Sequence, residues 1–272
     1  MKTETALKIA QLVDDSLRSL KAPSQPNLYT QPIHHAAAKA DTPAITENIK
    51  LFRRVMERIE ADVEDLATNS KTLVEFRERL GIYVQANPMT TEANMPFFME
   101  AVNGVATEYM NLVKSLPPGG TQELTKEIIR TRTMDHLTKL GTDTTSQLRN
   151  TLEQSINNQK GMRYARDEMA KNIEGMTKNR AEVIARTETV YARNQAELVK
   201  AEAKGKEYFI VVSAGDCCDD CYETYDGNTF HVPEDEDMLP PLHPNCRCTA
   251  TFFRTEEQAG EMADETSKPR EE

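Results

Sequence analysis

The chain is poor in the bulky residues that fill the core of a large enzyme domain. Its 272 residues include no tryptophan, aromatic residues are 6% of the total, and hydrophobic residues are 38%. Charged residues make up 28% of the chain, and its mean hydropathy is −0.62. This composition favours helices with narrow apolar stripes, or an elongated part that packs on a partner.

Two kinds of targeting or membrane segment are also missing. No run of about 18 apolar residues occurs, so we predict no membrane-spanning helix. The first residues, Met1–Thr5, lack the apolar segment of a secretory signal. We therefore expect a protein that is neither inserted in a membrane nor exported.

Positive charge is scarce at one end of the chain. Residues 206–272 hold 5 Lys and Arg against 17 Asp and Glu, a net charge of −12, whereas residues 1–205 carry +1. A domain that binds DNA through its phosphates needs a basic surface. The acidic end argues against a stand-alone DNA-binding protein, although it allows a position near DNA.

The common enzyme motifs are absent as well. The sequence has no glycine-rich phosphate loop, no Gly-x-Ser-x-Gly elbow and no His-Glu-x-x-His zinc motif. The motifs therefore indicate no enzyme class.

Apolar spacing and turn residues divide the chain into five segments. The N-terminal stripe, which includes Leu7, Val13 and Leu17, is too narrow for a helix that stands alone, so this helix either docks on a partner or folds back on the body. The strongest boundary is Pro117–Gly120. The predicted segments are an N-terminal docking helix (1–21), a Pro-rich linker (22–43), a helical region (44–116), a domain (121–253) and an acidic, flexible tail (254–272).

Helical periodicity covers most of the chain before residue 205. It predicts helices over 44–86 with a break near Asn69, and over 91–115, 121–140, 144–160, 163–174 and 177–204. Glycines at 141, 161 and 175 are the expected helix ends. β-Branched and aromatic runs then predict three short strands, over 208–213, 229–232 and 249–253.

Cysteine and histidine cluster between these strands. Cys218 and Cys221 follow the first strand, and His243, Cys246 and Cys248 precede the third. Thiolates and imidazole are the ligands that zinc prefers, and two close pairs from separate loops can meet on one tetrahedral ion. The predicted fold is therefore α+β and mainly α-helical: a helical N-terminal part, a second helical region and a small, zinc-stapled antiparallel β-sheet.

The identity of the metal ligands stays open at this level. Cys217 is the expected spare, and His243 and Cys246 compete for one position. The five cysteines are an odd number and lie close together, so they are a poor disulfide framework, but disulfides or a redox dithiol remain alternatives. His34, His35 and His136 have no partners at metal-ligand spacing, and His231 lies on a predicted strand as an ordinary exposed or core histidine, so none of the four is expected to take part in the site.

The order of motifs resembles the Mu F-like head-morphogenesis domain found in minor head proteins of tailed bacteriophages. The resemblance covers about residues 121–253. Its most specific part is the run Pro-Pro-Leu-His-Pro-Asn-Cys-Arg-Cys at 240–248. It further rests on Ile-Ala-Arg-Thr-Glu at 184–188 with Asn194, the strand at 208–213, and Asp-Gly-Asn-Thr-Phe at 226–230.

The resemblance implies a structural, non-enzymatic protein of the virion head, present in the host cytoplasm during assembly. It implies the portal protein and the major capsid or scaffolding protein as partners, a position near phage DNA, and a role in head assembly, DNA packaging or ejection. The alternative function is a metal-dependent hydrolase or nuclease that acts on head components or DNA. The two differ in whether protein fills all four positions on the metal.

A polar network is a further expectation. Arg186 and Glu188 lie on the predicted long helix and are placed to join Arg247 and the loop before Cys246, which would fix the helix to the zinc sheet. Side chains two positions apart do not face each other on a helix, so we expect one of the two to turn inward.

Overall fold

The structure is a computed structural model that describes residues 42–86, 88, 91–158, 160, 162–214, 217–232 and 234–266. The predicted N-terminal helix (1–21) and nearly all of the linker lie outside the described residues. The described residues form one compact unit. None of the described helices is long and apolar enough to cross a membrane.

Three helices make up the first part of the described chain: α2 (Pro43–Thr68), α3 (Leu73–Gln85) and α4 (Met95–Val113). The side chain of Thr42 caps α2 by accepting from the Ile45 N–H at 3.4 Å, and Thr72 caps α3 by accepting from the Glu75 N–H at 3.1 Å. The chain therefore breaks between α2 and α3, close to the break predicted at Asn69.

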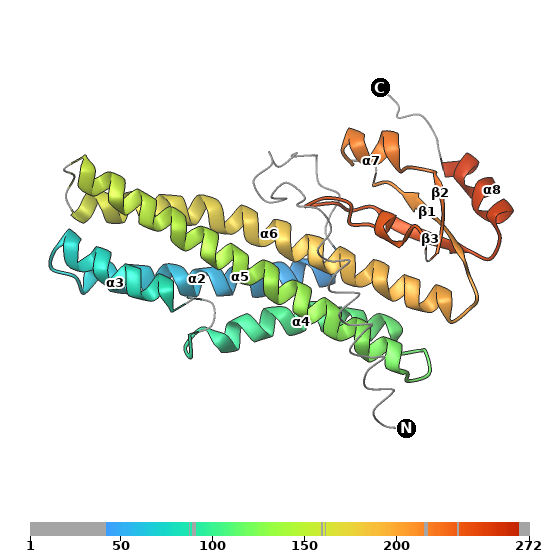
Figure 1. Cartoon of the computed structure of the whole chain (residues 1–272), viewed down its shortest axis with the longest axis horizontal. Helices are drawn as coiled ribbons and strands as arrows, with labels where there is room; N and C mark the ends of the chain where they lie inside the picture. The colour runs from blue at the N-terminus through green and yellow to red at the C-terminus, as the bar shows by residue number, and fades with distance from the viewer. Residues whose placement is uncertain are drawn as a thin grey trace. The chain divides into compact units, whose positions relative to one another are not determined.

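Two long helices follow, α5 (Gly120–Asn157) and α6 (Met162–Glu202), and they run side by side (Figure 1). Both are longer than the sequence predicts. The ends expected at Gly141 and Gly175 are wrong, because each glycine lies inside a continuous helix. Around Gly141 the buried face continues through Leu137, Thr144 and Leu148, and this packing outweighs the roughly 1 kcal/mol that a glycine costs inside a helix.

α6 is the central element of the helical part, because it packs on α2, α4 and α5. From Val183 to Val190 every residue except Arg186 is buried. A helix that is buried on all sides has neighbours all round it. The Mu F-like motif at 184–188 lies in this stretch.

A small antiparallel sheet follows α6. Its strands are β1 (Tyr208–Val212), β2 (Thr229–His231) and β3 (Thr249–Phe253), in the order β2-β1-β3. The chain is mainly helical and has one small antiparallel sheet, which confirms the predicted α+β fold class. Between the strands lie the short helix α7 (Asp219–Thr224) and the 3-10 turn η2 (Glu236–Met238).

The two faces of the sheet have different neighbours. Phe209 and Val211 of β1 share one buried cluster with Leu198 of α6 and with the thiols of Cys246 and Cys248. On the opposite face, Ile210 packs against Ala259 and Ala263 of the last helix, α8 (Glu256–Thr266).

The helix α8 differs from the flexible tail expected over 254–272. Ala259 and Ala263 are spaced four residues apart, which places both on one helix face, and they are 0% and 8% exposed. Two alanines make an apolar stripe too small to stand out among the acidic residues around them.

Candidate metal centre

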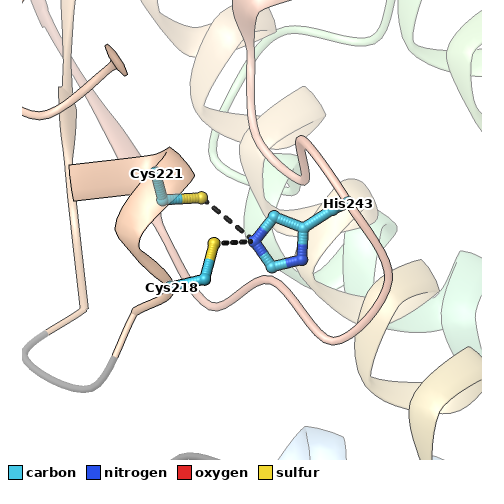
Figure 2. Close-up of side chains that lie close together, drawn as sticks. All are labelled: Cys218, Cys221 and His243. Carbon is cyan, nitrogen blue, oxygen red and sulfur yellow. Dashed lines mark hydrogen bonds between the residues drawn. The ribbon is translucent and has the colours of Figure 1, made fainter. Parts of the chain in front are cut away.

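Cys218 and Cys221 are positioned by the first turn of α7. Cys218 is the N-cap residue, and its carbonyl accepts a hydrogen bond from the Tyr222 N–H at 3.1 Å. Positions three apart in a helical turn lie on the same side, so the two sulfurs face a common point. Figure 2 shows both sulfurs turned toward His243.

His243 completes this first group. Its Nε2 lies 3.2 Å from Sγ of Cys218 and 3.0 Å from Sγ of Cys221 (Figure 2). Its Nδ1 lies 2.8 Å from the carbonyl oxygen of Pro244. A carbonyl oxygen can only accept, so this contact assigns the proton to Nδ1 and leaves the Nε2 lone pair pointing at the sulfurs.

A second group joins the first through Cys221. The sulfurs of Cys221, Cys246 and Cys248 lie within 4.8 Å of one another, as do the ligand atoms of Cys218, Cys221 and His243. Cys221, Cys246 and Cys248 are at most 1% exposed. All five residues that the sequence predicts as ligands therefore come together, and Cys221 is common to both groups.

The donor set fits a soft or borderline divalent ion. Four thiols and one imidazole with a free lone pair can hold a metal ion, and zinc is the usual metal for such a set. Hydrogen bonding with Cys246 and Cys248 raises the pKa of the Cys221 thiol, while the bond from Cys221 holds the pKa of Cys246 well below its ordinary value. The buried cluster therefore favours one thiolate even without a metal.

The thiols are not joined to one another. Cys217, Cys218, Cys221, Cys246 and Cys248 all lie in the described residues, and none is in a disulfide. Cys217, the expected spare, belongs to neither ligand group and is half-buried.

His231 lies on β2, where its Nδ1 is 2.5 Å from a carboxylate oxygen of Glu234.

α6 holds the loop at 243–248, which carries His243, Cys246 and Cys248. The Thr187 hydroxyl accepts from the Asn245 N–H at 2.9 Å, and the Arg186 guanidinium donates to the Asn245 side-chain oxygen. Asn245 has a φ of 65°, a left-handed conformation that asparagine tolerates better than most residues. These contacts fix the backbone between His243 and Cys246.

Asn194, about two turns further along α6, holds the end of the same loop. Its side-chain oxygen accepts from the Ala250 N–H at 3.1 Å, and its amide donates to the Cys248 carbonyl at 3.4 Å. Asn194 is 2% exposed, so these bonds satisfy polar groups that water cannot reach. The loop is therefore tied to α6 at both ends.

Arg186 and Glu188, two members of the expected polar network, point to different neighbours. Arg186 contacts the loop before Cys246, whereas the Glu188 carboxylate is wholly buried and contacts α5. There it accepts from Nε of Arg132 at 3.0 Å and lies 2.7 Å from Nδ1 of His136. Arg247 is half-buried in the loop between Cys246 and Cys248.

Arg132 and His136 are partners of Glu188 that the sequence analysis did not predict. They lie four positions apart on α5, and the Arg132 guanidinium also stacks over the Tyr191 ring, with 4.4 Å to its centroid. The available sign was the i, i+4 spacing of an arginine and a histidine on one predicted helix, with a glutamate on another. It was missed because the sequence assigns no partner helix to this segment.

Comparison with known protein families finds a match. Residues 146–251 match the family described as Phage Mu protein F like protein. The matched region begins within α5 and ends within β3, so it contains the ligand groups and the buried turn of α6. Comparison with curated proteins and with solved structures finds no match. The family match confirms, over residues 146–251, the resemblance inferred from the motifs.

Proposed function

We propose that this protein, with its Mu F-like region at residues 146–251, is a minor head protein of a tailed bacteriophage. It binds the portal protein or the head interior, has the major capsid or scaffolding protein as a further partner, and lies near the packaged DNA. It assists head assembly, DNA packaging or ejection, and it is present in the host cytoplasm until the head is built. The observation that carries this proposal is the family match over the region that holds the ligand groups.

The proposal is tested by the composition of the particle. Purified proheads and mature heads of the phage that encodes this chain are analysed by mass spectrometry. We expect peptides from this chain in heads, at far fewer copies than the major capsid protein. Absence from both proheads and mature heads would contradict the proposed role.

We propose that the metal is zinc and that its role is structural. Bound zinc would join α7 to the loop at 243–248 and so hold together the two segments that connect the strands. Three short strands bury little apolar surface and need such a link. We expect about one zinc per chain in protein purified without chelator. Chelation should loosen residues 206–253, as measured by amide hydrogen exchange, and leave the circular dichroism of α2 to α6 largely unchanged.

We propose that the protein is not an enzyme. A catalytic zinc keeps one position for water or substrate, whereas this cluster offers five protein donors for four positions. Labelled DNA and purified head proteins are incubated with the protein, with and without chelator. Chelator-sensitive turnover that is lost in His243→Ala with the fold retained would favour the hydrolase or nuclease alternative.

The N-terminal segment is proposed as the part that docks on a partner. Its apolar stripe at Leu7, Val13 and Leu17 is followed by a proline-containing stretch, which would let it reach away from the body. Deletion of residues 1–21 should leave the protein folded and abolish its incorporation into heads. Normal incorporation of the truncated chain would instead assign the stripe to local packing.

A further inference from the structure

We infer that Cys218, Cys221, His243 and Cys246 bind the metal, and that Cys248 lies beside them without binding it. The inference rests on the structural zinc site proposed above and assigns its ligands. It differs from the expectation that both cysteines of the second pair are ligands and that His243 and Cys246 compete for one position.

The four assigned ligands form two pairs of the same spacing. Cys218 and Cys221 are separated by two residues in the first turn of α7. His243 and Cys246 are also separated by two residues, and the Cys246 N–H donates to the His243 carbonyl at 3.2 Å, which closes a turn. A turn of this kind brings its first and fourth residues close together, to within about 7 Å between their Cα atoms. Each pair can therefore offer two donors to one ion.

His243 is prepared for coordination by the hydrogen bond at its other nitrogen. The Nδ1–H donates to the Pro244 carbonyl at 2.8 Å, and Nε2 faces the two sulfurs of α7. Metal-bound histidines in proteins usually donate the second ring N–H to a carbonyl or carboxylate, which fixes the ring orientation. His243 has this arrangement, so the imidazole is a ligand and one of the thiols is not needed.

Cys248 differs from Cys246 in what holds its backbone. Its carbonyl is bonded by Asn194, and β3 begins at the next residue, where Thr249 pairs with Val212. Cys248 thus belongs to the framework between α6 and the sheet. Its sulfur lies with those of Cys221 and Cys246, next to the assigned ligands.

Charge supports the same assignment. Zinc with three thiolates and a neutral imidazole carries a net charge of −1, whereas four thiolates would give −2. Cys221, Cys246 and Cys248 are at most 1% exposed, and a second negative charge in such surroundings is costly without a partner. A site built from His243 and three of the thiols avoids that charge.

The test compares two matched variants of the full chain, Cys246→Ala and Cys248→Ala. Both remove a buried thiol from the same loop. Zinc per chain is measured after purification without chelator. We expect about one zinc in the wild type and in Cys248→Ala, and less than half in Cys246→Ala. Loss of zinc from Cys248→Ala, or retention in Cys246→Ala, overturns the assignment.

X-ray absorption of the zinc-loaded wild-type protein gives a second result that needs no substitution. Three sulfurs and one nitrogen around zinc are expected, and four sulfurs overturn the assignment. If Cys248→Ala does not fold, Cys248→Ser replaces it with the same expectation. A wild-type protein without zinc contradicts the proposed structural metal itself, whereas a zinc-loaded wild type with an empty Cys248 variant contradicts only this ligand assignment.

Discussion

Glu188 and His136 meet across the interface between α5 and α6, with 2.7 Å between the carboxylate and Nδ1. Burial disfavours the charged carboxylate, but Arg132 and His136 more than offset this, so the pKa of Glu188 is lowered. Glu188 is 0% exposed, so the carboxylate is an ionised group held wholly by protein partners.

Removal of this charge should destabilise the fold. In Glu188→Gln, Arg132 and His136 lose their anionic partner in a buried setting, and we expect a loss of about 3 kcal/mol in the free energy of unfolding. Urea denaturation measures it. The control is Glu197→Gln on the same helix, whose carboxylate pairs with Lys200 in solvent and should change stability by less than about 1 kcal/mol. Equal effects in the two variants would show that the buried contact is not special.

The contribution of Glu188 should also depend on pH. A lowered folded-state pKa stabilises the protein fully above the ordinary value of 4.5, and this stability is lost as the pH falls through the lowered pKa. The difference in stability between wild type and Glu188→Gln should therefore be constant near neutral pH and shrink below pH 4.5. Urea denaturation at a series of pH values checks this, and a difference that grows on acidification contradicts the assignment.

Two glycines should respond to alanine with opposite signs. At Gly104 an added Cβ would lie 2.5 Å from Oδ1 of Asn48 and 2.6 Å from Cδ1 of Leu51, where α4 meets α2. We expect Gly104→Ala to cost about 1–3 kcal/mol. At Gly81 in α3 nothing lies within 4 Å, and Gly81→Ala should gain about 0.5–1 kcal/mol in helix propensity. Thermal unfolding of both variants measures the two shifts.

Asn194 should be needed to hold the ligand loop. Asn194→Ala leaves the Ala250 N–H and the Cys248 carbonyl without a side-chain partner, and we expect a loss of about 1–3 kcal/mol. Hydrogen exchange at the Ala250 amide should become faster. Gln195→Ala is the matched control, because the neighbouring residue points about 100° away around the helix. Unchanged exchange at Ala250 in Asn194→Ala would contradict the role.

The sequence predicts the sheet well and the long helices poorly. The strand at 249–253 is found with the same bounds, because an aromatic and β-branched run between turn residues has few alternatives. Glycine was a misleading guide to helix ends, since Gly141 and Gly175 lie inside α5 and α6. At Gly141 the local cost is outweighed by the packing of α5 on α6, which depends on residues far away in the chain.

The candidate site, too, could be predicted from the sequence only in part. Spacing was sufficient to select five residues that the structure brings together, because cysteine and histidine are rare and their turns are local. The partners of Glu188 could not be found in this way. His136 is 52 residues from Glu188, and only the packing of α5 on α6 joins the two.

One turn of α6 has a consequence for how the molecule can move. Thr187 contacts the ligand loop through Asn245, Glu188 contacts α5 through His136, and Thr189 accepts from Asn48 of α2 at 3.0 Å. Successive helix residues point about 100° apart, so three consecutive side chains fasten the helix in three directions. Rotation of α6 about its axis would break at least two of these attachments. The three contacts therefore fix the rotation of α6 about its own axis. A displacement of α2 or α5 beside residues 187–189 would carry the ligand loop with it.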